Sequence, residues 1–212
     1  MSRALPSSFG KSVCLVCPMR SRRISQRSIT ADNTHGKDKK VTEMFEQNDI
    51  LVYGNNGVCR VSDIRKERFS GSSPKMYYIL SPVFGSQSTL YVPTENLKLS
   101  SKLRPVMLKE TLEEMMNTAK ITEVSWVNDD RKREEQFHSI VSNGLSCELL
   151  LVMKAIIIRR NELKKKIKKL HASDERVLAI CEKIVGEEYA YAFGVDVDDA
   201  LSHIEEKLSG VA

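Results

Sequence analysis

The chain has 212 residues, enough for one large domain or two small ones, and its formal net charge is +5. Residues 1–43 carry nine Lys and Arg against three Asp and Glu, so the remainder is close to neutral and is not a uniformly basic nucleic-acid-binding protein. No apolar run approaches the roughly 20 residues that a membrane-spanning helix needs, which excludes a protein with such helices.

Residues 1–43 differ in composition from the rest of the chain. They are rich in Ser and Arg and have little apolar periodicity, which predicts a disordered tail or non-native leader. Two other interpretations stay open: the functional chain begins at Met44, or the segment is an organelle transit peptide.

The chain has five cysteines, at positions 14, 17, 59, 147 and 181. Their number is odd and their spacing irregular, which argues against a disulfide framework and favours a reducing cytoplasm. The Cys14-x-x-Cys17 pair lacks a second pair at zinc-ligand spacing, so no metal site is predicted.

Residues 45–100 show short runs of β-branched and aromatic residues separated by turn residues. Four strands are predicted, at residues 50–53, 58–64, 76–80 and 89–92. The Asn56-Gly57 pair suits a tight hairpin turn, and the apolar pattern of the second strand indicates a bulge or strong twist. We therefore expect a small, strongly bent antiparallel sheet or barrel.

From Pro105 onward the apolar residues follow helical periods, so residues 101–212 are predicted to be all-α. The predicted helices are centred on residues 108–119, a short segment ending near 141, 145–170, 173–193 and a last one from 196 to about 210. Ser173 is a suitable N-cap for the fourth of these helices. The boundary between the two parts is expected near residues 98–105.

Catalytic motifs are not found in this sequence. It contains no phosphate-binding P-loop, no G-x-S-x-G nucleophile elbow and no H-E-x-x-H pair. We therefore expect a protein that is not an enzyme and has no cofactor. A hydrolase that uses the acidic clusters at Asp129-Asp130 and Asp196 to Asp199 is a weaker alternative.

Trp126 is the only tryptophan, and it lies in a charged stretch just before Arg131, Lys132 and Arg133. It is either an anchor packed between helices or an apolar side chain presented to a partner. Cations beside an apolar wedge suit the edge of a DNA duplex, because the cations neutralise phosphates where the wedge fills space between bases. The lysine run at 164–169 is interpreted as a solvated helix face.

Several distinctive motifs follow one another along this chain. Residues 45–64 read F-x-x-N-D-I-L-V-Y-G-N-N-G-V-C-R-V-S-D-I, residues 77–80 read Y-Y-I-L and residues 91–96 read Y-V-P-T-E-N. The tryptophan with its basic run, the Ser142-x-Gly144 break and the S-D-E-R-V-L stretch from Ser173 follow. From Met44 the chain thus resembles the CarD/CdnL family of bacterial transcription regulators, whose first domain is shared with the transcription-repair coupling factor.

This resemblance implies an α+β fold with a Tudor-like bent sheet or barrel at residues 44–100 and a helical domain at residues 101–212. The family's first domain binds the β subunit of bacterial RNA polymerase by adding its strand edge to a polymerase strand. Carried over by position, the polymerase contacts are Arg65, Lys66, Glu67 and Tyr91. Some relatives have a cation where this chain has Tyr91, so that contact is expected to be apolar here.

The family's helical domain contacts promoter DNA at the upstream edge of the transcription bubble without sequence-specific readout. The resemblance assigns the minor-groove wedge to Trp126, and the backbone contacts to Arg131, Lys132, Arg133 and Arg176. The segment from Trp126 to Gly144 is longer than in the shorter family members, which leaves the register of the basic contacts open.

The expected protein is therefore a cytoplasmic, monomeric transcription regulator that binds RNA polymerase, stabilises the promoter open complex and does not associate with membranes. The alternative is a protein-interaction adaptor that binds its partner through the lysine face and makes no direct contact with DNA.

Overall fold

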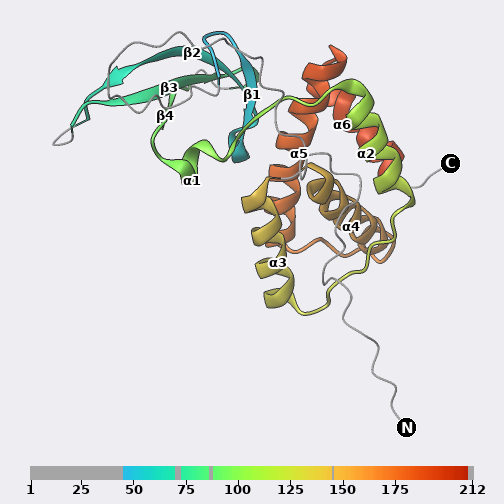
Figure 1. Ribbon diagram of the computed structural model, residues 1–212. Helices are drawn as coiled ribbons and strands as arrows, with labels where there is room; N and C mark the ends of the chain where they lie inside the picture. The colour runs from blue at the N-terminus through green and yellow to red at the C-terminus, as the bar shows by residue number, and fades with distance from the viewer. Residues whose placement is uncertain (1–44, 70–72, 86–87, 145, 210–212) are drawn as a thin grey trace. The chain divides into compact units, whose positions relative to one another are not determined.

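The computed structural model describes residues 45–69, 73–85, 88–144 and 146–209 (Figure 1). The chain divides into two compact units, whose described parts are residues 45–107 and 108–209. The predictions for residues 1–43 lie outside the described residues. No helix in the described ranges is both long enough and apolar enough to span a bilayer.

The first unit is a five-stranded antiparallel sheet with the strand order β4-β3-β2-β1-β5. Its elements are β1 (Ile50–Tyr53), β2 (Val58–Glu67), β3 (Lys75–Pro82), β4 (Leu90–Pro93), the short helix α1 (Leu97–Ser100) and β5 (Leu103–Pro105). The four predicted strands are confirmed. The sheet is open, with β4 and β5 as its edges, so the closed barrel that was one of the two expectations is not seen in the described residues.

The turn and the bulge of the first unit have clear local causes. A 3-10 turn, η2 (Gly54–Asn56), joins β1 to β2, and the positive φ values of 45° and 78° belong to Gly54 and Gly57. The pairing of β2 with β3 shifts register between Val61 and Asp63, which confirms the predicted bulge. Beyond this point β2 continues in register with β3 to Glu67.

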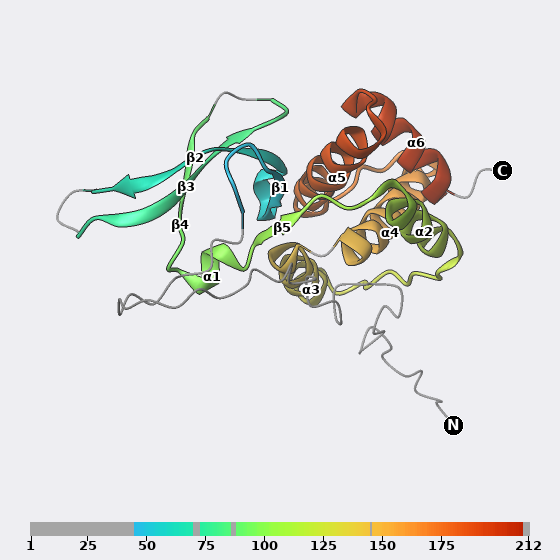
Figure 2. The ribbon, with the colours of Figure 1, turned by 45° about the horizontal axis from the view of Figure 1, so that its top comes forward.

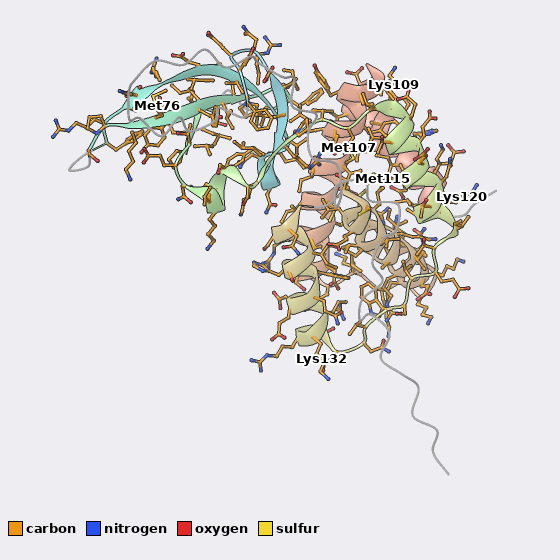
Figure 3. The ribbon with its side chains drawn as sticks, viewed as in Figure 1. Met76, Met107, Lys109, Met115, Lys120 and Lys132 are labelled. Carbon is orange, nitrogen blue, oxygen red and sulfur yellow. The ribbon has the colours of Figure 1, made fainter. Side chains whose placement is uncertain are left out.

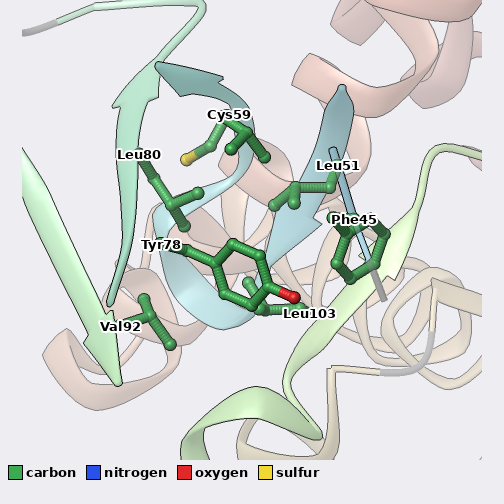
Figure 4. Close-up of a cluster of buried hydrophobic side chains, with 8 residues drawn as sticks. Phe45, Leu51, Cys59, Tyr78, Leu80, Val92 and Leu103 are labelled. Carbon is green, nitrogen blue, oxygen red and sulfur yellow. The ribbon is translucent and has the colours of Figure 1, made fainter. Parts of the chain in front are cut away.

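The core of the first unit lies on one face of its sheet (Figure 4). The ring of Phe45, which precedes β1, stands edge-on to Tyr78 with centroids 6.2 Å apart. The buried cluster draws on every strand and consists of Phe45, Leu51, Cys59, Val61, Tyr78, Leu80, Val92 and Leu103. Leu103 comes from β5, a three-residue strand that the sequence pattern does not predict. The first unit therefore ends at Met107, a little beyond the expected boundary.

Within the described residues, the second unit consists of five helices, four of which pack against the fifth, α4. They are α2 (Lys109–Ile121), α3 (Asp130–Asn143), α4 (Ser146–Lys165), α5 (Ala172–Phe193) and α6 (Val197–Ser209). Helix α4 packs against each of the other four helices (Figure 2), and Leu149, Val152 and Ile156 of its predicted stripe are buried. The all-α prediction is confirmed for the described residues from Leu108 onward, whereas its first residues, from 101, include strand β5 of the first unit.

The ends of these helices follow ordinary capping chemistry. The Asp129 carboxylate accepts from the Lys132 backbone N–H at 3.1 Å and caps α3. Gly144 and Gly194 end α3 and α5 in the left-handed region, with φ of 66° and 69°. Helix α5 begins one residue before the predicted cap, because His171 and not Ser173 is its N-cap.

Candidate functional site

Trp126 lies between α2 and α3, in residues 122–129, which we call the Trp126 segment. The indole is half-buried and stands edge-on to Phe137 of α3, with ring centroids 6.3 Å apart and an interplanar angle of 71°. Two guanidinium groups approach the same indole. The Arg133 Cζ lies 4.5 Å from its ring centroid and the Arg159 Cζ lies 5.6 Å from it, both within cation–π range.

Arg133 ties the Trp126 segment to α3 and α5. Its Nε and Nη2 donate to the two carboxylate oxygens of Asp174 at 2.9 Å each, which is the bidentate geometry of a strong charge-assisted pair. Its Nη1 donates to the Val127 carbonyl at 2.8 Å, and its Nη2 also donates to Asp130 Oδ1 at 2.8 Å. This bond holds the pKa of Asp130 below its usual value.

The burial of Arg133 corrects one expectation from sequence. Its side chain is only 3% exposed, and all three of its guanidinium nitrogens donate to protein acceptors. A phosphate therefore has no access to it in this arrangement. Arg133 supports Trp126 in the fold, and it is not placed as the DNA backbone contact that its position in the basic run suggests.

Lys154 of α4 holds the other end of the Trp126 segment. Its Nζ donates to the carbonyls of Ala119, Lys120 and Thr122 at 2.9, 2.7 and 2.7 Å. The last carbonyls of a helix have no partners within that helix, so the ammonium caps the C-terminus of α2. Burial lowers the pKa of Lys154.

The Trp126 segment is thus fixed near both ends by buried cations from neighbouring helices. Lys154 binds it at Thr122, and Arg133 binds it at Val127. A side chain on such a segment is held in one orientation before any partner arrives, which lowers the entropy cost of binding. Sequence reasoning missed this role of Lys154, although a single lysine inside the most apolar run of the chain is a detectable signal.

The other predicted DNA contacts are exposed. Arg131 lies 3.7 Å from Glu135, and Lys132 lies 3.9 Å from Asp129 and projects from the first turn of α3 (Figure 3). Exposed pairs of this kind contribute less than about 1 kcal/mol, so both cations can exchange their partner for a phosphate. Arg176 is exposed on α5, two residues after the Asp174 that binds Arg133.

A shallow hollow borders the indole on the side of α4. Its volume is about 90 Å³. It is lined by Val124, Trp126, Ala155, Ile158, Arg159 and Glu162. This hollow leaves part of the indole accessible from outside the unit.

The predicted polymerase contacts lie toward one end of the sheet. Arg65 pairs with Asp63 at 3.2 Å and with Glu67 at 2.7 Å along β2. Arg65 stands opposite Tyr77 of β3, so the two side chains share a face of the sheet. Lys66 follows Arg65 directly in the strand and points to the other face.

Tyr91 belongs to the aromatic triad, which we define as Phe69, Tyr77 and Tyr91; Phe69 and Tyr91 are exposed and Tyr77 is half-buried. The three rings meet edge to face, with centroids 5.2 Å apart for Phe69 and Tyr77, 5.4 Å for Phe69 and Tyr91 and 6.5 Å for Tyr77 and Tyr91. Tyr91 lies on the edge strand β4 and is 42% exposed. Sequence reasoning named Tyr91 but missed Phe69, which follows the end of β2.

Residues 45–107 match the family model of the CarD-like/TRCF RID domain. The matched range coincides with the described part of the first unit. No curated protein matches the chain. The resemblance drawn from the motifs between residues 45 and 96 is thereby confirmed, and the chain carries a domain of the kind found in regulators that interact with RNA polymerase. The motifs from Trp126 onward lie outside the matched range.

Proposed function

We propose that this protein is a non-enzymatic transcription regulator that binds RNA polymerase through residues 45–107 and contacts promoter DNA through its helical unit. The observation that carries the proposal is the match of the first unit to the CarD-like/TRCF RID domain. The helical unit lies outside the matched range, so its role is argued from its own residues. The protein acts as a monomer in the cytoplasm under this proposal.

Polymerase docking uses the edge strand β4 and the aromatic triad. An edge strand has backbone N–H and C=O groups that can pair with a strand of another chain, and the triad adds apolar area beside that edge. Aromatic side chains are enriched where protein interfaces are tightest. The docking partner is the β subunit of the polymerase, and Tyr91 supplies the apolar contact expected of it.

The DNA contact uses Trp126 with Arg131, Lys132 and Arg176 around it. The Trp126 indole lies on a segment that is fixed near both ends. The side chains of Arg131, Lys132 and Arg176 are exposed cations. An indole that enters the minor groove at the upstream edge of the bubble gains contacts only when that DNA is open. It therefore shifts the balance toward the open complex by its differential affinity, about 1–3 kcal/mol for a modest coupling.

Replacement of Trp126 by Ala tests the proposal. We expect Trp126→Ala to bind polymerase as the parent chain does and to shorten the lifetime of the open complex about tenfold, since the wedge is lost. Competitor-challenged lifetime and polymerase pull-down are the two measurements. Ile121→Ala is the matched control, because it removes an exposed apolar side chain at the end of α2.

Two results would contradict parts of this proposal. An unchanged open-complex lifetime with intact polymerase binding removes the wedge from the mechanism. Polymerase binding without any affinity for promoter DNA, even at low salt, favours the adaptor that makes no contact with DNA.

A further inference from the structure

The connection between α4 and α5 concentrates more positive charge than any stretch named above. We call residues 164–169 the lysine turn; they read K-K-K-I-K-K. All five lysines are exposed, and none forms an ion pair with another residue in the described part of the chain. Only the first two lie on α4, because the helix ends at Lys165. The solvated helix face expected from sequence is therefore largely a turn.

Ile167 occupies the most unusual backbone position of the lysine turn. Its φ is +55°, and its N–H donates to the Lys164 carbonyl at 3.1 Å while the N–H of Lys168 donates to Leu163 at 2.9 Å. These bonds form a Schellman C-cap, in which glycine normally takes the left-handed position. A β-branched residue there is strained, and the Ile167 side chain is also 97% exposed. Neither helix capping nor core packing accounts for isoleucine at this position.

The lysine turn is joined at both sides to residues that contact the Trp126 site. Arg159, which lies over the Trp126 ring, precedes the end of α4 by six residues, or about 9 Å of helix rise. Asp174, which binds Arg133, follows Lys169 by five residues. The lysine turn and the Trp126 segment therefore lie at the same end of the helical unit.

We propose that the lysine turn is a second DNA-binding site, which grips the phosphate backbone of the duplex that adjoins the wedge. The inference rests on the proposed function and adds a contact that does not depend on Trp126. The lysines neutralise phosphates, and Ile167 packs its apolar side chain against the sugars of the groove wall. Phosphate contacts of this kind give affinity and position without reading the base sequence.

The first experiment measures how salt weakens the binding of the full chain to a fluorescein-labelled duplex promoter fragment, followed by anisotropy. Lys168→Gln/Lys169→Gln changes two lysines that lie outside any helix. We expect the slope of log K against log salt to become shallower by about two, and affinity at low salt to fall on the order of tenfold. The control Lys183→Gln/Lys207→Gln makes the same charge change on α5 and α6, and we expect the parent slope.

The second experiment separates DNA binding from folding. Ile167→Gly relieves the strained position, so its melting temperature should rise, while its affinity for the same duplex falls about fivefold through loss of buried apolar area. A variant that only damaged the fold would lower both quantities. A higher melting temperature together with a lower DNA affinity is therefore expected only if the Ile167 side chain contacts DNA.

Two outcomes would overturn the inference, and a third would separate it from the proposed wedge. If Lys168→Gln/Lys169→Gln has the same salt slope as the control pair, the lysine turn does not bind DNA. This conclusion holds even if Trp126→Ala still shortens the lifetime of the open complex. Loss of binding to phosphatidylglycerol vesicles with unchanged DNA affinity would assign the turn to an anionic membrane instead. Conversely, an unchanged open-complex lifetime for Trp126→Ala with a shallower slope for the lysine variant rejects the wedge and keeps the turn.

Discussion

The three consecutive basic residues after Trp126 differ in exposure: two face solvent and one is buried. Successive positions on α3 are turned by about 100° from each other, so Arg131 and Lys132 face solvent while Arg133 faces α5. The sequence identifies the basic run but not which member is buried, because the partner carboxylate of Arg133 is 41 residues away. Exposure, and not the density of charge along the chain, decides which of these cations can reach a phosphate.

The stability of the helical unit should depend on the buried pair of Arg133 and Asp174. We expect Arg133→Met to lower the free energy of unfolding by about 3–5 kcal/mol, because it leaves the Asp174 carboxylate buried without a counter-charge. Urea unfolding measures this change. Arg131→Met, on the exposed side of the same turn, should change the free energy by less than about 0.5 kcal/mol.

A double variant checks the cause of that loss. Arg133→Met combined with Asp174→Leu removes both charges, so most of the lost stability should return. Equal losses for the single and the double variant would mean that the guanidinium stabilises the fold mainly through its bonds to Val127 and Asp130.

At the scale of single elements, β4 combines an unpaired edge with exposed aromatic side chains. Edge strands are usually protected by charge or by proline, and here Pro93 ends the strand after four residues. Tyr91 is exposed while its ring packs edge-on against Phe69. A short edge of this kind suits a specific partner better than indiscriminate strand pairing.

The aromatic triad should determine the affinity for polymerase. We expect the double variant Phe69→Ala/Tyr91→Ala to weaken polymerase binding by at least about tenfold, as loss of interface aromatics generally does. The affinity is measured as the binding of each variant to surface-immobilised polymerase core. Leu97→Ala is the control, because Leu97 is 83% exposed in the same unit but lies on α1. Equal affinities for the two variants would remove the triad from the interface.

The elements that sequence predicts well are those with strong local signals. Strand β4 ends at Pro93 and Gly144 caps the end of α3. Proline lacks a backbone N–H and glycine readily adopts a left-handed conformation, so the residue type alone predicts each of these ends. Strand β5 has only three residues and is a strand because β1 pairs with it. Helix α4 stops before the predicted Leu170 because Ile167 adopts a left-handed conformation that its residue type disfavours.

At the scale of the whole molecule, each unit has its own core and the RID match ends where the first unit ends. The candidate residues fall into two sets accordingly, with the triad in one unit and the Trp126 segment in the other. The sequence motifs predict this division. They do not predict that Arg133 and Lys154 hold the Trp126 segment, because both interactions join residues distant in sequence.

The boundary of the first unit can be tested with two fragments. Residues 45–107 should fold alone, whereas residues 45–100 should not, since the shorter fragment loses Leu103 from the core and leaves the edge of β1 unpaired. Thermal unfolding followed by circular dichroism distinguishes them. Cooperative unfolding of residues 45–100 would show that β5 is dispensable.

The solitary indole has a spectroscopic consequence. Trp126 is the only tryptophan in the chain, so all indole emission of the native protein arises from the side chain that is proposed to enter DNA. In the free protein this emission reports an indole beside two guanidinium groups. Stacking against a base would quench it and shift its maximum, so the unlabelled protein carries an intrinsic optical probe at its own wedge.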